Sequence, residues 1–406
     1  MRAGLLGGIA AIVMLAGCAA ETQTVSPQGY PVAKDAVVST AMTVAPGDMA
    51  RMQQVGSEIL FWDQPTRERN FRNMEKIFPG YVVEAGSRVK ALPAGVPLPV
   101  DGATIDAYMK ANNVAGLIVL QDGRVRLERY GLGFGREGRW TSFSVAKSFT
   151  STLVGAAIKD GFIQSVDEPV TRYIPELAGS GYDGVTIAQL LTMTSGVKWN
   201  ESYTDPNSDV ARMYATPAPA GMDATVAYMR TLPRETTPGE KFVYKTGETN
   251  LIGVLVSNAI GDRSIATYLS EKIWKPYGME ADAFWMTDPS GQEVSGCCLS
   301  VSLRDYARMG QFALEGGAGL VPEGWIAEAT RAHVTLNAAG FGYGYQWWTY
   351  PGEMYGGQGI FGQSITVDPK TRTVVAIVSA WPRATGTDLT MPRLKFVSEL
   401  MAAAGQ

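Results

Sequence analysis

The chain has 406 residues, of which 46% are hydrophobic and 18% are charged, and its net charge is −4. This length and composition are those of a globular protein with one large core or two closely packed domains. The small negative net charge gives no indication of the basic surface that nucleic-acid binding requires, so no nucleic-acid partner is expected.

The N-terminal segment has the pattern of an export signal. A single cation, Arg2, precedes an apolar run over residues 5–16 that is too short for a convincing membrane span. The run ends in the letters LAGC, which resemble a bacterial lipobox with Cys18 as the lipidated residue. This resemblance predicts a lipoprotein signal peptide over residues 1–18 and anchoring in the bacterial cell envelope, at the outer membrane and facing the periplasm. The alternative is an ordinary signal peptide cleaved nearby, in which Cys18 has no role.

The rest of the chain divides into three parts. Residues 19–48 are small, polar and proline-containing, which predicts a tether. Residues 49–98 begin with an amphipathic stretch and are expected to form a helical N-terminal extension. Residues 99–406 form the main domain, with a helical insert at about residues 140–295.

Two hairpin patterns, one near each end of the main domain, predict its sheet. Residues 114–131 (VAGLIVLQDGRVRLERYG) place two apolar strands around Asp122-Gly123, and residues 363–381 (QSITVDPKTRTVVAIVSAW) place two β-branched strands around Pro369. The sequence between them is mostly helical in pattern. We therefore expect an α/β (α+β) fold, in which an antiparallel sheet from both chain ends is flanked by helices and carries the helical insert.

Ser144 and Lys147 are the candidate nucleophile and base. The S-x-x-K pattern also begins at Ser87 and Ser195, but only Ser144 opens a stretch with helical apolar spacing, which stops near Gly161. A serine and a lysine three residues apart share one helix face, with Cβ atoms about 5–6 Å apart. A buried lysine can serve as the base that a serine nucleophile needs, because burial lowers its pKa.

A histidine-based triad lacks its usual signals in this chain. His333 is the single histidine, and no G-x-S-x-G motif is present. Such triads are recognised by geometry and roles, and no sequence motif marks a serine as the partner of His333. We therefore expect His333 to be a structural or surface residue.

Two further stretches could complete a site around Ser144. Tyr244 lies between a Pro-Gly turn and an apolar helix, and a neighbouring ammonium is expected to lower the pKa of its phenol and let it relay protons. The glycine-rich segment YGGQGIFGQSITVDP enters a strand, where bare backbone N–H groups could bind an oxyanion. The alternative for each is ordinary packing or an ordinary turn.

In this order, the motifs resemble those of the β-lactamase-related serine hydrolases: class C β-lactamases, D,D-peptidases, family VIII esterases and 6-aminohexanoate-dimer hydrolases. The resemblance covers about residues 100–400 and includes phrases such as TIAQLLTMTSGVKW, PGEKFVY and GYGYQWW. The three family motifs would be Ser144/Lys147, Tyr244-Lys245-Thr246 and Gly357-Gln358-Gly359. The resemblance implies that Ser144 is acylated, that Lys147 and Tyr244 share the acid–base work, and that the N–H groups of Ser144 and Ile360 hold the oxyanion. It implies no metal and no cofactor.

Departures from the family pattern bear on the substrate. Thr246 stands where the family has Asn or Ser, and Gly357 stands where β-lactamases and D,D-peptidases have a lysine for the substrate carboxylate. Without that cation we expect penicillins to be poor substrates. By resemblance, Tyr203 would close over a bound amide, although a surface aromatic is the alternative, and Thr246, Gln358 and Gly359 are further substrate-binding candidates. Four aromatic residues could wall an apolar acyl pocket or belong to the core: Trp199, Trp347, Trp348 and Phe361.

Cys297 and Cys298 are neighbours in the chain. They cannot connect distant elements or form a metal site alone, and a disulfide between neighbours is strained. Two small buried residues are the favoured interpretation, and their pairing stays open.

These observations predict a lipid-anchored serine hydrolase that cleaves a small amide or ester through a Ser-Lys-Tyr acyl-enzyme mechanism, similar to 6-aminohexanoate-dimer hydrolases. One alternative is a carboxylesterase with weak β-lactamase activity. Another is a non-catalytic envelope-binding protein, which would have no need of Ser144, Lys147 and Tyr244 together. The expected partners are a small-molecule substrate and the membrane through the lipid anchor, and no oligomeric state is predicted.

Overall fold

The computed structural model describes residues 32–39, 58–261 and 263–405. The predicted signal peptide, Cys18 and most of the predicted tether lie outside these residues. The described part of the tether, residues 32–39, is packed on the domain, since Ser39 N donates to Gly80 O at 3.1 Å and Val82 N to Val37 O at 2.7 Å. Within the described ranges, no helix has both the length and the apolar character needed to cross a membrane.

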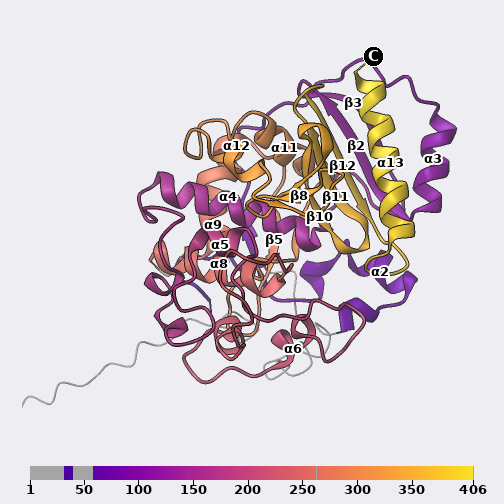
Figure 1. Ribbon diagram of the computed structural model, residues 1–406. Helices are drawn as coiled ribbons and strands as arrows, with labels where there is room; N and C mark the ends of the chain where they lie inside the picture. The colour runs from indigo at the N-terminus through magenta and orange to yellow at the C-terminus, as the bar shows by residue number, and fades with distance from the viewer. Residues whose placement is uncertain (1–31, 40–57, 262, 406) are drawn as a thin grey trace, which may run out of the picture.

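The main sheet has eight antiparallel strands and takes strands from both ends of the main domain, as the hairpin patterns predicted (Figure 1). The hairpin after Val114 lies directly beside the C-terminal hairpin, with Ile118 opposite Ala376. In spatial order the strands are β3 (Arg124–Tyr130), β2 (Val114–Gln121), β12 (Thr373–Ser379), β11 (Gln363–Asp368), β10 (Tyr355–Gly359), β9 (Trp348–Thr349), β8 (Gly342–Tyr343) and β7 (Val334–Thr335).

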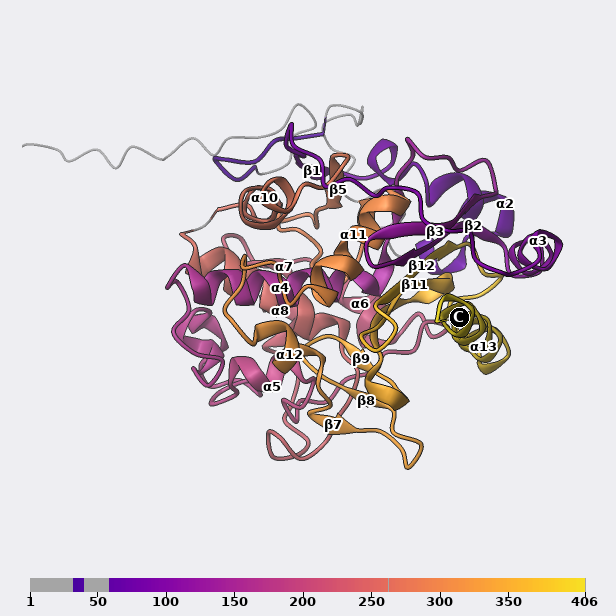
Figure 2. The same ribbon diagram turned by 90° about the horizontal axis from the view of Figure 1, so that it is seen from above.

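Helices cover both faces of this sheet. On one face lie α3 (Gly102–Ala111) and α13 (Thr387–Ala404), and on the other lies α11 (Leu303–Leu314) (Figures 1 and 2). Strands β2 and β12 are therefore buried on both faces, which explains why they are apolar almost throughout instead of alternating.

A second sheet of four short antiparallel strands includes the N-terminal extension. Its order is β1 (Gly80–Val83), β5 (Ala283–Met286), β6 (Leu299–Val301) and β4 (Trp140–Thr141). The extension was expected to be helical, but its described part contains one short helix, α2 (Gln64–Asn70), two 3₁₀ turns and strand β1. Because Phe71, Met74 and Phe78 are buried in the main core, the extension is part of the domain.

The helical region lies beside the sheet and carries the expected helix signals. Ser144 lies in a 3₁₀ turn, Phe143–Val145, that leads into α4 (Ala146–Lys159), and Gly161 follows with φ of +80°. Thr186 and Gln189 form a capping box at the start of the next helix, α5 (Ile187–Leu191). The remaining helices are α6 (Asp209–Ala215), α7 (Ala224–Met229), α8 (Thr246–Ala259), α9 (Ile265–Leu269), α10 (Lys275–Tyr277) and α12 (Trp325–Thr330).

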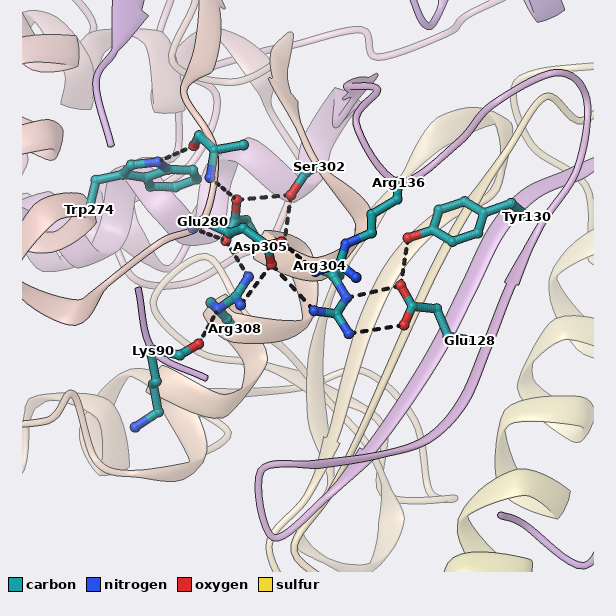
Figure 3. A network of polar contacts seen from close by, with 11 residues as sticks. Lys90, Glu128, Tyr130, Arg136, Trp274, Glu280, Ser302, Arg304, Asp305 and Arg308 are labelled. Atoms are coloured by element: carbon teal, nitrogen blue, oxygen red, sulfur yellow. Dashed lines mark hydrogen bonds and ion pairs between the residues drawn. The ribbon is translucent and has the colours of Figure 1, made fainter. Parts of the chain in front are cut away.

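A network of charged side chains connects α11 to β3 and to the chain before β5 (Figure 3). Glu280 is at its centre, with Arg136 and Arg308 each 2.8 Å from its carboxylate and Arg304 at 3.5 Å. Arg304 also binds Glu128 at 3.0 Å. Burial acts to raise the pKa of Glu280, but the hydrogen bonds and charges of the arginines outweigh it and lower this pKa to about 2.

This network predicts a loss of stability in acid. The unfolded pKa of Glu280 is near 4.5, so its contribution is present above pH 4.5 and is lost as the pH falls from 4.5 to about 2. We expect about 1 kcal/mol, because solvent screens a carboxylate that is partly exposed. Chemical unfolding at pH 7 and pH 3 should show a smaller pH dependence for Glu280→Gln than for the wild type. The exposed Glu323→Gln is the control, and an equal pH dependence in wild type and Glu280→Gln would contradict the prediction.

Candidate active site

The structure brings the first two predicted motifs together at the start of α4. Lys147 is buried, and its Nζ lies 3.1 Å from Ser144 Oγ and 3.1 Å from Thr246 Oγ1. Its third contact is the carbonyl of Gly296, at 2.6 Å. Burial lowers the pKa of Lys147 to about 8, although the charge of Glu201 opposes this shift. A lysine with such a pKa is partly neutral near pH 7, as a general base must be.

The other two S-x-x-K serines lie in different surroundings. Ser87 is exposed on the surface. Ser195 is fully buried and donates its hydroxyl hydrogen bond to the Glu248 carboxylate. Neither has an arrangement like that of Ser144 and Lys147.

Tyr244 lies beside Lys147, with the lysine Nζ 5.1 Å from its ring centroid. Its ring stacks on Trp348 at 5.5 Å. The expectation that an ammonium would lower its pKa is wrong. Burial is the main cause that raises the pKa of Tyr244, the charge of Glu201 adds to it, and a hydrogen bond with Ser144 acts against it. The phenol therefore keeps its proton and can donate it.

Glu201 is a site residue that the sequence analysis missed. Its carboxylate accepts hydrogen bonds from Tyr203 Oη at 2.9 Å, from the Thr246 N–H at 2.9 Å, from the Thr246 hydroxyl and from the Trp199 indole. It thus connects the loop that carries Tyr203 to the start of α8, whose Thr246 contacts Lys147. The only signal in the sequence was an acid two residues before Tyr203.

The end of strand β10 lies against the backbone of the nucleophile. A Cβ atom on Gly359 would be 3.1 Å from Ser144 N and 2.6 Å from Ser142 O, so only glycine allows this close approach. Ile360 follows directly and lines the same pockets as Ser144. A Cβ on Gly357 would lie 3.1 Å from Ser148 Oγ, so a side chain at this position would require its neighbours to shift.

A cation does lie at the third motif, which corrects an expectation from the sequence. Arg393 of α13 is buried, donates to the amide oxygen of Gln358 and lies 5.0 Å from the ring centroid of Trp381. It also donates to Gln363 O at 3.3 Å. Among the ion pairs of the described residues, none involves Arg393. The sequence separation of 35 residues between Arg393 and Gln358 left no local signal for this contact.

Cys297 and Cys298, whose pairing the sequence left open and which were interpreted as two small buried residues, are joined in a disulfide. They follow Gly296, whose carbonyl holds Lys147, and both line a pocket at Ser144.

Two pockets meet at Ser144, and Tyr203 and Ile360 line both of them. The first is largely apolar and also contains Thr246. The second contains most of the polar groups of the site, namely Glu201, Tyr244, Gln358 and Arg393, together with Gly359. Of the predicted catalytic and substrate-binding residues, all but Lys147 line one or both of these pockets, and Lys147 contacts Ser144 directly. Cys18 lies outside the described residues.

The four aromatic residues that the sequence could assign either to an acyl pocket or to the core mostly do not line the pockets, and neither does His333. Trp348 lines the second pocket, while Trp347 and Phe361 are fully buried in the core and Trp199 binds Glu201. His333 contacts the carbonyl of Glu328 at 3.0 Å and stacks on Tyr345, and it lines neither pocket.

Comparison with known proteins assigns the family. The family model described as Beta-lactamase matches residues 102–397. The chain belongs to the beta-lactamase family. Within this family it is 33% identical over 324 residues to the 6-aminohexanoate-dimer hydrolase of Paenarthrobacter ureafaciens, which covers 75% of this chain and 80% of the relative. It is also 24% identical over 169 residues to a beta-lactamase of Pseudomonas fluorescens, covering 39% and 43%.

Solved structures of the family confirm the fold. A protein assigned as a 6-aminohexanoate-dimer hydrolase from Bacillus anthracis aligns with a TM-score of 0.73 at 20% identity, over 83% of this chain and 94% of that one. A D-stereospecific amidohydrolase from Streptomyces sp. aligns with a TM-score of 0.54 at 22% identity, over 72% and 98%. The protein is a serine hydrolase with the beta-lactamase fold, close to 6-aminohexanoate-dimer hydrolases.

Proposed function

We propose that this protein hydrolyses linear amides and esters through a covalent acyl-enzyme on Ser144. The observation that carries the proposal is the buried Lys147, whose Nζ is 3.1 Å from Ser144 Oγ and whose pKa is lowered to about 8. The neutral lysine takes the hydroxyl proton, and the oxygen of Ser144 attacks the substrate carbonyl. The N–H groups of Ser144 and Ile360 stabilise the oxyanion that forms.

Tyr244 supplies the proton for the leaving group in this mechanism. Its phenol passes its proton to the leaving nitrogen or oxygen as the bond to the carbonyl carbon breaks, and the proton held by Lys147 restores the phenol. Water then attacks the acyl-enzyme with Lys147 again as base, which releases the acid and frees Ser144. The raised pKa of Tyr244 suits a group that must hold its proton until this step.

A linear amide with a charged leaving group fits the second pocket. The lack of a lysine at Gly357 is no argument against a carboxylate-bearing substrate, because Arg393 lines the same pocket as Ser144. The 6-aminohexanoate dimer, the substrate named for the relative from Paenarthrobacter ureafaciens, carries a carboxylate on its amine half. We propose that this chain acts on linear amides whose amine half carries a carboxylate.

Turnover of three substrates by one preparation tests this function. We expect hydrolysis of the linear 6-aminohexanoate dimer and of a p-nitrophenyl ester, with an acyl-enzyme detectable by mass spectrometry, and a penicillin serves for comparison. Folded protein that turns over neither the amide nor the ester would contradict the proposal and favour a binding protein.

The charge of Glu201 leads to a prediction about pH dependence. The rate should rise with pH as Lys147 loses its proton, near pH 8 in the wild type. Glu201 raises this pKa, so Glu201→Gln should move the acid limb of kcat/KM to lower pH. Loss of the contacts to Tyr203 and Thr246 should also reduce kcat/KM by about tenfold at the optimum.

The exposed Glu235→Gln is a matched control for this pH measurement. Its carboxylate pairs with Lys241 at 3.6 Å on the surface, so the acid limb should stay where the wild type has it. An acid limb that is unchanged in Glu201→Gln would show that Lys147 does not set the pH dependence.

A further inference from the structure

The chain ahead of the family-matched residues lines a pocket of the active site. The family model begins at residue 102, yet Ile59, Leu60 and Phe78 all contribute to the pocket that contains Ser144. These residues come from the first 3₁₀ turn and from the chain just before β1. The N-terminal extension is thus one wall of the first pocket.

The same extension supports the backbone around the nucleophile. The ring of Phe71 lies 5.0 Å from that of Phe143 and 5.3 Å from that of Phe361. Phe143 and Phe361 adopt φ of +42° and +59°, a region that non-glycine residues enter only when packing holds them there. Phe143 directly precedes Ser144, and Phe361 directly follows Ile360. The extension therefore holds its wall in a fixed place relative to both proposed oxyanion donors.

The first pocket has the character of a site for an aliphatic chain. Its other walls include Val210 and Tyr214 of α6 and Met286 of β5. The pocket also contains the carboxyl group of Asp288, which is only 7% exposed. This group already accepts three hydrogen bonds, two from Ser290 and one from the N–H of Gln292. The cavity volume is about 110 Å³. This volume is about seven or more times the 10–15 Å³ that a site for one water needs, so there is room for a short aliphatic chain.

The position of Tyr244 decides which half of a substrate enters this pocket. Tyr244 lines the second pocket and not the first, and it is the proposed donor to the leaving atom. The leaving group must therefore lie in the second pocket, on the side of Tyr244. The carbonyl carbon at Ser144 then directs its acyl substituent into the first pocket.

We propose that residues 59–79 form the wall of an acyl-chain subsite, which takes an aliphatic acyl group of about four to eight carbons and sets the acyl specificity of the enzyme. This inference rests on the proposed acyl-enzyme mechanism at Ser144. Each buried methylene adds about 0.8 kcal/mol, which corresponds to about fourfold in kcat/KM for each added carbon while the pocket fills.

Two series of esters test the subsite. The first varies the acyl chain, from p-nitrophenyl acetate to p-nitrophenyl octanoate, and the second varies the alcohol, from ethyl to hexyl butyrate. In the wild type, kcat/KM should rise with acyl length to an optimum and depend only weakly on alcohol length. Leu60→Trp should fill the pocket and lower the ratio of the hexanoate to the acetate kcat/KM about tenfold or more.

A matched control is available one residue away. Phe61 is 54% exposed, lies in the same 3₁₀ turn and does not line the pocket, so Phe61→Trp should keep the wild-type profile. If Leu60→Trp does not fold, Leu60→Ala should instead move the optimum to longer acyl chains. An unchanged acyl profile in a folded Leu60 variant, or an effect confined to the alcohol series, would overturn the proposal. Absence of hydrolysis of all these esters and of the amide by the wild type would instead contradict the proposed function.

Discussion

Replacing Ser144 with alanine should lower kcat for both the amide and the ester by about 10⁴-fold or more, because the covalent route needs the serine oxygen. The variant should fold normally, since the helix after Ser144 is held by its buried apolar residues and the serine side chain caps no helix in the structure. A phosphonate that labels serine nucleophiles should modify the wild type and leave Ser144→Ala unmodified. Circular dichroism and thermal unfolding then show whether the loss is chemical.

Two other serines serve as controls of different kinds. Ser87→Ala changes an exposed serine with the same S-x-x-K spacing, so labelling and turnover should remain as in the wild type. Ser195→Ala removes a buried hydrogen bond to Glu248 and should lower stability by about 1–3 kcal/mol while labelling persists. Labelling that survives in Ser144→Ala would remove Ser144 from the mechanism.

Local sequence patterns were enough to predict the frame of the site. The turn residues Asp122-Gly123 and Pro369 fall at the two expected hairpins, and the alternatives for the S-x-x-K serines could be separated by the apolar spacing after Ser144. Such patterns act within a few residues, where backbone conformation and side-chain spacing decide the structure. The resemblance of the three motifs, in their order along the chain, to those of a known family then predicted that these distant motifs would lie together in one site.

Contacts between distant residues were not accessible in the same way. Arg393 reaches Gln358 from α13, and Glu201 reaches Thr246 across 45 residues, with no periodicity to show either pairing. The direction of the Tyr244 pKa shift was predicted wrongly because burial outweighs the neighbouring ammonium. Strand β1 was not predicted, because a run of four residues gives little indication of a strand in the sequence. Its pairing partner, β5, lies about 200 residues further along the chain.

Tyr244→Phe should separate the two classes of substrate. The variant keeps the ring that stacks on Trp348 but loses the proton that the phenol would donate. An amine leaves poorly without a proton, so kcat for the amide should fall by about 10²–10⁴-fold. The p-nitrophenolate ion leaves without protonation, and its ester should lose only about tenfold.

The contrast between amide and ester is the decisive part of the Tyr244 measurement. Tyr343→Phe is the control, because its ring packs on Tyr244 at 6.2 Å and the change removes a hydroxyl from the neighbouring aromatic position. It should leave both substrates within about threefold of the wild type, as expected for a packing residue. If Tyr244→Phe slowed the amide and the ester equally, the phenol would act by orienting Ser144 and Lys147 and not by protonating the leaving group. The leaving group would then have no reason to lie beside Tyr244, and the assignment of the acyl chain to the pocket walled by residues 59–79 would lose its basis.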